Sequence, residues 1–383
     1  MSKILLRFNP DHDLALAADS AHYTAPPNAA LFAIDMATLP CWIASEGEAE
    51  SAMPMVEEYS LLGGGCSVTT KLTPKDYDGV NLWGWNKAEF HRLLRRGFCP
   101  EQLPDTSVLE TVRSLSHRAT ASRLACFLND LPYSFPPAAE QLTTMDAIDL
   151  YIKKYPSVVL KAPWSGSGRG LVWVNGSLQM AAANRCQKLL QTQGSVMGEV
   201  RQDVIQDFAM EFLRSESSTR FTGYSVFGTK NGVYAYSVLG NEAYLESALT
   251  QYISRDILLA VREACVRFIA DELKGYEGNV GIDMFIFRRD DDSYGLNPAV
   301  EVNMRNTMGN VALEFSTRWL APGSHGRFYI DFSAEPSPLL ADHISRQKEK
   351  PLTLHEGKIV KGYLSLCPVT AQTHYRARVE IES

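Results

Sequence analysis

The chain lacks several features that would narrow its class at once. No apolar run reaches the roughly 20 residues that a membrane-spanning helix needs, and the first residues turn polar too soon for a secretory signal. The 7 cysteines are scattered and form no Cys-x-x-Cys pair. We therefore expect reduced thiols rather than a disulfide framework or a zinc site. Together these absences predict a cytoplasmic protein with no membrane partner.

An excess of positive charge is missing as well. The chain has 37 lysines and arginines against 44 aspartates and glutamates, a formal net charge of -7. Broad nucleic-acid binding needs a basic face, so we expect no nucleic-acid partner, although a local basic pocket for phosphate stays open. With 383 residues, 45% of them apolar, the chain is long enough for one large domain or two to three ordinary ones.

The order of expected elements predicts three regions and no internal repeat. Residues 1–114 begin with a strand at Ile4–Phe8 and include a helix at Lys87–Arg96, which is typical of a small α/β domain. Residues 115–332 mix helices with apparent hairpins, as an α+β domain does. Residues 333–383 are a Pro-rich, charged linker followed by two strand-like runs, a β extension for which the sequence suggests no role.

The most informative stretch ends a strand at residues 297–305. Side chains alternate faces along a strand, so Glu301, Asn303 and Arg305 point the same way. A carboxylate beside an amide oxygen suits a hard cation such as magnesium, and an arginine suits phosphate oxygens. Any half-buried strand shows such alternation, so a face that merely contacts water is the alternative.

Asp283 is the lone charge in an apolar strand, Val280–Phe287. This strand is expected to pair as a hairpin with Gly295–Val302, which places Asp283 near Glu301. Buried charges are costly unless paired or metal-bound, and two neighbouring carboxylates repel without a cation between them. A pair with a local arginine is the competing interpretation.

Lys161 ends an apolar strand at Ser157–Lys161, just before a loop of serines and glycines at Ser165–Gly170. The lysine can reach a phosphate as a point charge, and backbone amides of a loop with little side-chain bulk can approach phosphate oxygens. The loop is not a P-loop, because GxxxxGK[ST] is absent. A hairpin turn with a solvated lysine explains these residues as well.

Two further segments carry candidate nucleotide contacts. The Val204-Ile205 run leads to an expected strand end at Gln206, Asp207 and Phe208, where exposed backbone can bind an adenine edge. Glu211 follows and can hold ribose hydroxyls, with Glu216 as its rival. Acidic residues at strand ends are common, so this signal is weak alone.

Arg118 is expected at the start of a helix capped by Ser116. There it can be a second basic phosphate contact from the far side of a cleft. A solvated helix residue is the competing account.

The order of these candidate residues along the chain resembles the ATP-grasp superfamily. The order is Arg118, Lys161 with its Ser/Gly loop, the 206–211 segment, Asp283 and then Glu301-Val302-Asn303-Met304-Arg305. The resemblance covers residues 115–332. It implies an ATP-grasp fold of two α+β subdomains, preceded by an α/β domain. In this family ATP lies between the subdomains, a carboxylate is phosphorylated to an acylphosphate, and an amine or similar nucleophile displaces the phosphate.

The resemblance also implies roles for single residues. Magnesium, or manganese in its place, would bind Asp283, Glu301 and Asn303, and Arg305 and Lys161 would serve catalysis. The nucleotide would contact Arg118, Lys161, Ser167, Gly168, Gly170, Gln206, Asp207, Phe208 and Glu211. Two positions depart from the family pattern: Arg118 stands where many members have lysine, and Gln206 where glutamate is more usual.

The sequence thus predicts an ATP- and magnesium-dependent ligase whose partners are a small carboxylate and a small nucleophile. A phosphotransferase on the same fold and a non-catalytic nucleotide-binding regulatory protein are the alternatives. A homo-oligomer is compatible with the sequence. The Asp11-His12-Asp13 motif either binds a metal or a substrate amine, or forms a turn with a helix cap at Asp13. Trp83 and Trp85 are expected in the core, and Arg220 near the cleft.

Overall fold

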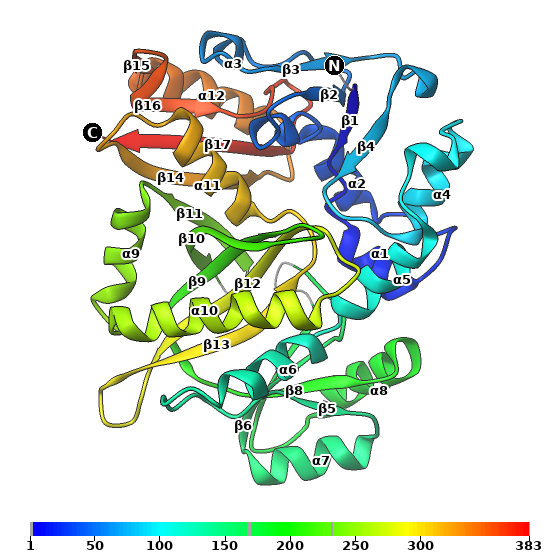
Figure 1. The fold of residues 1–383 in the computed structure, drawn as a ribbon, viewed down its shortest axis with the longest axis vertical. Coiled ribbons are helices and arrows are strands. Elements are labelled where there is room, and N and C mark those ends of the chain that lie inside the picture. The colour runs from blue at the N-terminus through cyan, green and yellow to red at the C-terminus, as the bar shows by residue number, and fades with distance from the viewer. Residues whose placement is uncertain (1–2, 167–169, 231–232, 383) are drawn as a thin grey trace.

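The structure is a computed structural model that describes residues 3–166, 170–230 and 233–382. It contains three sheets, each with its own packing helices (Figure 1). None of the helices in these ranges is long and apolar enough to cross a membrane.

The N-terminal part, blue to cyan in Figure 1, is a parallel sheet in the order β3-β2-β1-β4. The α/β character expected here is confirmed. Its strands are β1 (Ile4–Arg7), β2 (Gly47–Glu50), β3 (Cys66–Thr69) and β4 (Gly79–Leu82). Its helices are α1 (His12–Ala18), α2 (Pro27–Asp35), α3 (Glu57–Leu61), α4 (Lys87–Arg95) and α5 (Thr106–Leu115), with short 3-10 turns η1 (Leu39–Trp42), η2 (Pro74–Asp76) and η3 (Pro100–Gln102).

A small antiparallel sheet follows in the order β5-β8-β6-β7. Its strands are β5 (Glu140–Leu142), β6 (Ser157–Lys161), β7 (Leu171–Asn175) and β8 (Val196–Val200), and its helices are α7 (Met145–Lys154) and α8 (Met180–Gln193). Branched side chains such as Val158 and Leu160 fill the core between this sheet and its helices. β6 ends at Lys161 as expected.

The large sheet has nine strands in the described residues, in the order β13-β12-β9-β10-β11-β14-β17-β16-β15. They are β9 (Asp203–Arg214), β10 (Thr219–Lys230), β11 (Val233–Leu239), β12 (Gly278–Arg288), β13 (Tyr294–Asn303), β14 (His325–Phe332), β15 (Thr353–His355), β16 (Lys358–Ser365) and β17 (Tyr375–Glu382). Both expected hairpin pairings are confirmed, although residues 231–232 of the first turn lie outside the described residues. The C-terminal strands extend this sheet, and the domain boundaries near residues 114 and 332 stay a prediction.

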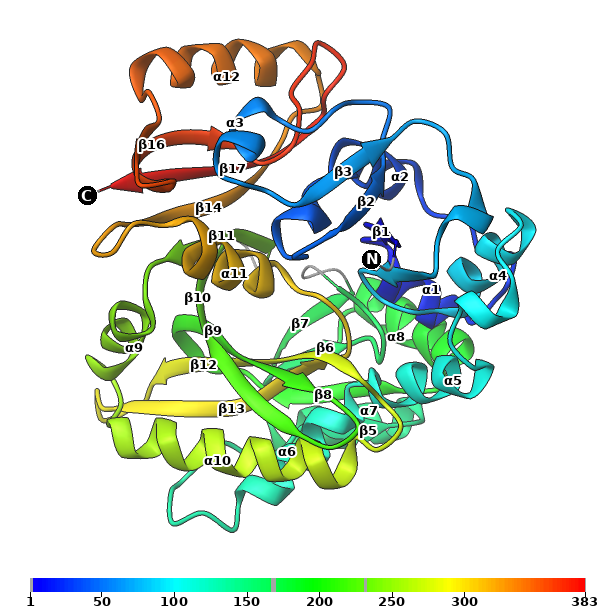
Figure 2. The ribbon, with the colours of Figure 1, turned by 45° about the horizontal axis from the view of Figure 1, so that its top comes forward.

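Helices cover both faces of the large sheet (Figure 2). They are α6 (Ala119–Leu128), α9 (Glu242–Thr250), α10 (Arg255–Glu272), α11 (Met308–Trp319) and α12 (Ser337–Glu349). Phe208 and Phe212 of β9 and Phe268 of α10 are buried in the same core. The expected cap at Ser116 is wrong: α5 ends there, and α6 begins after Arg118. Trp83 is buried in a second core and Trp85 packs beside a third, which confirms their expected place.

Candidate active site

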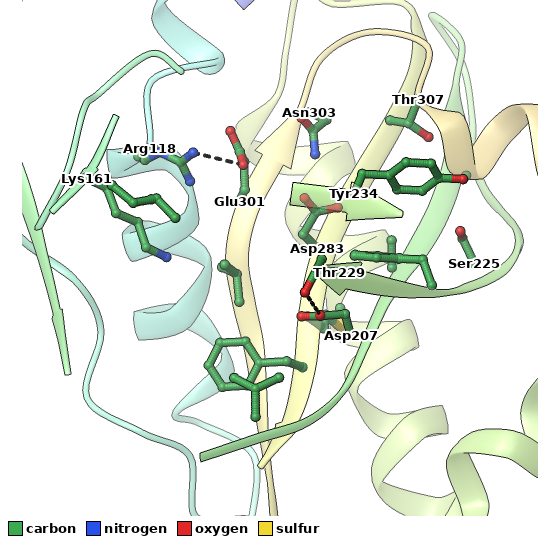
Figure 3. A pocket seen from close by; sticks show the side chains of 18 of the residues that line it. Arg118, Lys161, Asp207, Ser225, Thr229, Tyr234, Asp283, Glu301, Asn303 and Thr307 are labelled. Atoms are coloured by element: carbon green, nitrogen blue, oxygen red, sulfur yellow. Dashed lines mark hydrogen bonds and ion pairs between the residues drawn. The ribbon is translucent and has the colours of Figure 1, made fainter. Parts of the chain in front are cut away.

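A cavity of about 400 Å³ opens between the small and the large sheet. Its size falls in the range of small-molecule sites. Lys161 and Glu199 line it from the small sheet, and Asp207, Asp283 and Glu301 from the large one. Figure 3 shows Lys161 on one side and Asp207, Asp283 and Glu301 on the other. The cavity therefore collects side chains that are far apart in the sequence.

Two carboxylates form one wall of this cavity. Asp283 on β12 stands directly opposite Glu301 on β13, and Asn303 follows two residues later on the same face. Burial raises the pKa of Asp283 well above its usual range, and the nearby charges of Glu301 and Glu211 raise it further. Such a wall needs a cation to keep both carboxylates ionised.

The residues present fit a hard cation such as magnesium, which takes oxygen ligands. Within the described residues, no three His, Cys, Asp or Glu side chains form a metal-binding group. A metal here would therefore use Asp283, Glu301 and the amide oxygen of Asn303, together with oxygens from outside the protein.

Lys161 and Glu199 form a buried ion pair across the small sheet, with 2.5 Å between Nζ and Oε2. β6 and β8 are neighbours, which brings the two residues together. Each is less than a tenth exposed. Glu199 was not among the predicted site residues, since its partner strand could not be read from one sequence.

Arg118 lies on the same side of the cavity as Lys161 and contacts Glu301 in the wall formed by the two carboxylates. Its Nη2 stands 3.0 Å from Glu301 Oε2. Its Nε donates to Ala162 O at 3.1 Å, and Nη2 donates to Ser165 O at 3.2 Å. Arg118 thus ties the start of the glycine loop to Glu301, which a solvated helix residue would not do.

Of the predicted loop contacts, Ser167 and Gly168 lie outside the described residues. Gly170 is described and has φ +80°, a backbone conformation that favours glycine. A Cβ on Gly166 would come within 2.4 Å of Asp13 Oδ2, so the beginning of the loop packs against the N-terminal part.

The expected strand end at Gln206, Asp207 and Phe208 is wrong. These residues lie inside β9, whose backbone is paired with β10 and β12 on both sides. Because side chains alternate along a strand, Asp207 lines the cavity while Phe208 is fully buried in the core. The Gln206 side chain donates to Phe227 O at 2.9 Å instead.

The chain crosses from the small to the large sheet between β8 and β9, at Arg201 and Gln202. Both residues line the cavity. They were missed, although the apolar run Val196–Val200 before them could have been recognised as a strand.

Glu211 lies on the cavity floor two alternate positions beyond Asp207. It accepts hydrogen bonds from Thr307 Oγ1 at 2.7 Å and Asn310 Nδ2 at 3.1 Å. Burial raises its pKa to about 7, against the effect of these donors. Its rival Glu216 is exposed and lies outside the cavity lining.

Arg305 lines the cavity just beyond β13 and is held by the N-terminal part. Its Nη2 and Nε donate to the two carboxylate oxygens of Asp13 at 2.9 and 3.2 Å. Asp13 belongs to the Asp11-His12-Asp13 motif, and Asp11 is the N-cap of α1 without a side-chain cap bond. Asp13 is therefore the residue of this motif that is linked to the site, through its hydrogen bonds with Arg305.

Comparisons with known proteins give structural matches alone. No family model and no curated sequence matches the chain. Biotin carboxylase from Campylobacter jejuni, in complex with β,γ-ATP, has a TM-score of 0.54 at 12% identity over 100% of this chain and 87% of that one. The biotin carboxylase domain dimer of Hydrogenobacter thermophilus 2-oxoglutarate carboxylase, with MgADP, ADP and bicarbonate, has 0.52 at 12% identity over 100% and 86%.

A third match is N5-carboxyaminoimidazole synthetase from Staphylococcus aureus with ADP. Its TM-score is 0.50 at 10% identity, over 98% of this chain and 92% of that one. The chain has the ATP-grasp fold. Its cavity between the two sheets is lined by Lys161, Asp283 and Glu301. The expected fold class is thereby confirmed.

Proposed function

We propose that this protein is an ATP-dependent ligase that activates a small carboxylate as an acylphosphate and joins it to an amine or similar nucleophile. The proposal rests on one observation: Asp283 and Glu301 stand opposite each other on neighbouring strands, and Lys161 lines the same cavity from the small sheet. Solved structures of the same fold hold ADP, MgADP or an ATP analogue. The proposed partners are small molecules and a second copy of the chain, since one matched structure is a dimer.

In this proposal Asp283, Glu301 and Asn303 hold magnesium, with manganese as a substitute. When bound, the metal neutralises charge on the nucleotide phosphates. Lys161 and Arg118 lie on the facing side and contact phosphate oxygens. Phosphoryl transfer needs such charge neutralisation and alignment more than a nucleophilic side chain, and these residues supply it.

The adenine contact is proposed at Arg201 and Gln202, where the chain crosses between the sheets, rather than at Gln206 and Phe208. Asp207, held by Thr229 Oγ1 at 3.0 Å, stays a candidate for the nucleotide. Glu211 is better suited to the metal side than to ribose, because it raises the pKa of Asp283. Arg305 stabilises the transferred phosphoryl group through those guanidinium N–H groups that do not donate to Asp13.

Product analysis separates this ligase from the alternatives. Purified protein is incubated with ATP and magnesium chloride plus pairs of small carboxylates and amines, and ADP and phosphate are measured. A ligase releases both products when a carboxylate and a nucleophile are present together. A phosphotransferase would leave a stable phosphate ester, and a regulatory protein would be stabilised by ATP without forming ADP.

Glu301→Gln tests the metal wall directly. Gln keeps the size of the side chain and an acceptor for Arg118 but removes the charge, so magnesium-dependent turnover should fall by at least about tenfold while the fold persists. The matched control is Glu263→Gln on the exposed side of α10. Turnover equal to that of the parent protein in Glu301→Gln would contradict the metal assignment.

A further inference from the structure

A second cavity, of about 110 Å³, lies on the same face of the large sheet as the first. One water needs roughly 10–15 Å³ of such space, so the cavity has room for a small organic molecule. It sits where the N-terminal part meets the ATP-grasp part, because β4 and α11 both contribute to it. Its polar lining consists of Asn81, Arg220, Thr222, Asn279, Asn306, Asn310 and Glu314.

The first turn of α11 separates the two cavities. Glu211 and Thr307 line the first cavity, whereas Asn310 lines the second and donates to Glu211 Oε2 at 3.1 Å. Glycines let this turn lie flat on the sheet: a Cβ on Gly309 would come within 2.2 Å of Glu211 Oε1, and one on Gly281 within 3.0 Å of Thr307 Cγ2. A ligand in the second cavity therefore does not reach the proposed reaction centre.

The second cavity holds two opposite charges that do not pair with each other. Arg220 on β10 is exposed and Glu314 on α11 is partly buried. Among the described residues, neither has a hydrogen bond or an ion pair through its side chain. The Thr222 hydroxyl, on the same strand as Arg220, is buried without a partner in the described part of the chain. Buried polar groups are normally satisfied, so this hydroxyl indicates a missing partner.

Amide side chains line the same cavity. Asn279 Nδ2 donates to Asn306 Oδ1 at 2.6 Å, and Asn306 Nδ2 donates to Leu82 O at 3.4 Å. Within the described residues this leaves the side-chain oxygen of Asn279 without a hydrogen-bond partner. Asn81 adds a third amide from β4. Amide groups both donate and accept hydrogen bonds, so they suit a ligand that carries both kinds of group.

We propose that this cavity is a second ligand site, for a small zwitterion of the amino-acid class. The planar guanidinium of Arg220 suits a carboxylate, and the Glu314 carboxylate suits an ammonium group. A phosphate or another dianion would be repelled by Glu314, and a simple amine would leave Arg220 without a partner. The proposal concerns binding alone and does not depend on the ligase reaction.

The test uses the full chain and isothermal titration with glycine, L-alanine and L-serine at millimolar concentration, without ATP. Propionate and ethylamine are the matched probes, since each lacks one charge of alanine. We expect at least one zwitterion to bind and its two single-charge analogues to bind at least about tenfold more weakly. Binding of none of the three, or equal binding of propionate, would overturn the proposal.

Two variants locate the binding. Arg220→Gln and Glu314→Gln should each weaken zwitterion binding by at least about tenfold, because each removes one charge-assisted contact. Arg267→Gln, an exposed arginine on α10, should leave it unchanged. Thermal unfolding checks that all three variants fold. Zwitterion binding that survives Arg220→Gln would belong to another part of the molecule and would overturn the assignment.

A ligand in the second cavity should affect ATP binding in the first cavity, an expectation that rests on the proposed function. Arg305 Nη1 donates to Asn306 O at 3.2 Å, so a lining residue of the second cavity holds a residue of the first. The zwitterion and ATP should then change each other's affinity by the same factor. An unchanged ATP affinity in the presence of saturating zwitterion would remove this coupling and leave the binding site itself standing.

Discussion

Arg305 and Asp13 are 292 positions apart in the sequence, yet two hydrogen bonds join their side chains. The pair links the residues just beyond β13 to α1, the first helix of the N-terminal part. Both side chains are about one-sixth exposed. The pair therefore positions Arg305 at the cavity and at the same time holds two parts of the fold together.

Replacing Asp13 by Asn should lower the free energy of unfolding by about 2 kcal/mol, because it leaves a largely buried guanidinium without its counter-charge. Urea unfolding measures the change. The control is Asp19→Asn at the exposed end of α1, where the pair with Lys87 is more than a third exposed, and where we expect a loss below about 1 kcal/mol. Equal losses in the two variants would show that the Asp13–Arg305 pair contributes no more to the free energy of unfolding than the exposed Asp19–Lys87 pair does.

Lys161→Met should weaken ATP binding and also destabilise the fold, because it leaves the Glu199 carboxylate buried without a cation. Breaking such a pair costs about 3–5 kcal/mol. The double variant Lys161→Met/Glu199→Gln should recover most of the stability without recovering ATP binding. Thermal unfolding and an ATP titration measure the two effects. Full recovery of ATP binding in the double variant would assign Lys161 a structural role alone.

His12 should make the stability of the protein depend on pH. Its ring is buried, and its Nε2 has no hydrogen-bond partner in the described part of the chain. Burial lowers its pKa from the ordinary 6.5 to about 4, with the Arg305 charge adding to the effect. Below pH 6.5 the His12 ring binds a proton in the unfolded chain but stays neutral in the folded protein. The free energy of unfolding therefore falls as the pH drops from 6.5 toward 4.

The fall should approach about 1.4 kcal/mol per pH unit for this one proton. His12→Gln should reduce that slope, as measured by urea unfolding at several values between pH 7 and pH 5. His355→Gln is the control, because its side chain is three-quarters exposed. A slope that is the same in His12→Gln and the parent protein would mean that His12 is not the residue that resists protonation.

The position of Asp283 opposite Glu301 was predictable because its signal is local. Asp283 and Glu301 each interrupt an apolar strand, and a short turn joins the two strands, so alternation and pairing bring them together. The strand end at Gln206 was wrongly predicted because β9 is 12 residues long and carries polar side chains in its middle. A polar residue in such a strand looks like a strand end when its neighbours in the sheet are unknown.

Contacts between distant segments were beyond the sequence for a different reason. Lys161 with Glu199, Arg118 with Glu301, and Arg305 with Asp13 depend on which strands are neighbours and how the N-terminal part docks. Arg220 was expected near the cleft, but it lines the second cavity. No periodicity in a single chain encodes these pairings.

Gly309→Ala tests the wall between the two cavities. Alanine favours a helix over glycine by about 1 kcal/mol, but its Cβ would lie 2.2 Å from Glu211 Oε1 and 2.8 Å from Ser225 Oγ. Glu211 cannot withdraw easily, since Thr307 and Asn310 hold its carboxylate. Overpacking of this kind costs about 1–3 kcal/mol, so we expect a net loss of stability.

A double-mutant cycle with Glu211→Ala separates the clash from other effects of the alanine at position 309. Removing the Glu211 carboxylate abolishes the 2.2 Å contact, while the contacts with Ser225 Oγ at 2.8 Å and Cβ at 2.9 Å remain. Gly309→Ala should therefore become clearly less destabilising in the Glu211→Ala background. Urea unfolding of the parent, the two single variants and the double variant measures the coupling, which should exceed about 1 kcal/mol. Additive effects would show that Glu211 can move aside and that the turn of α11 does not depend on close packing against it.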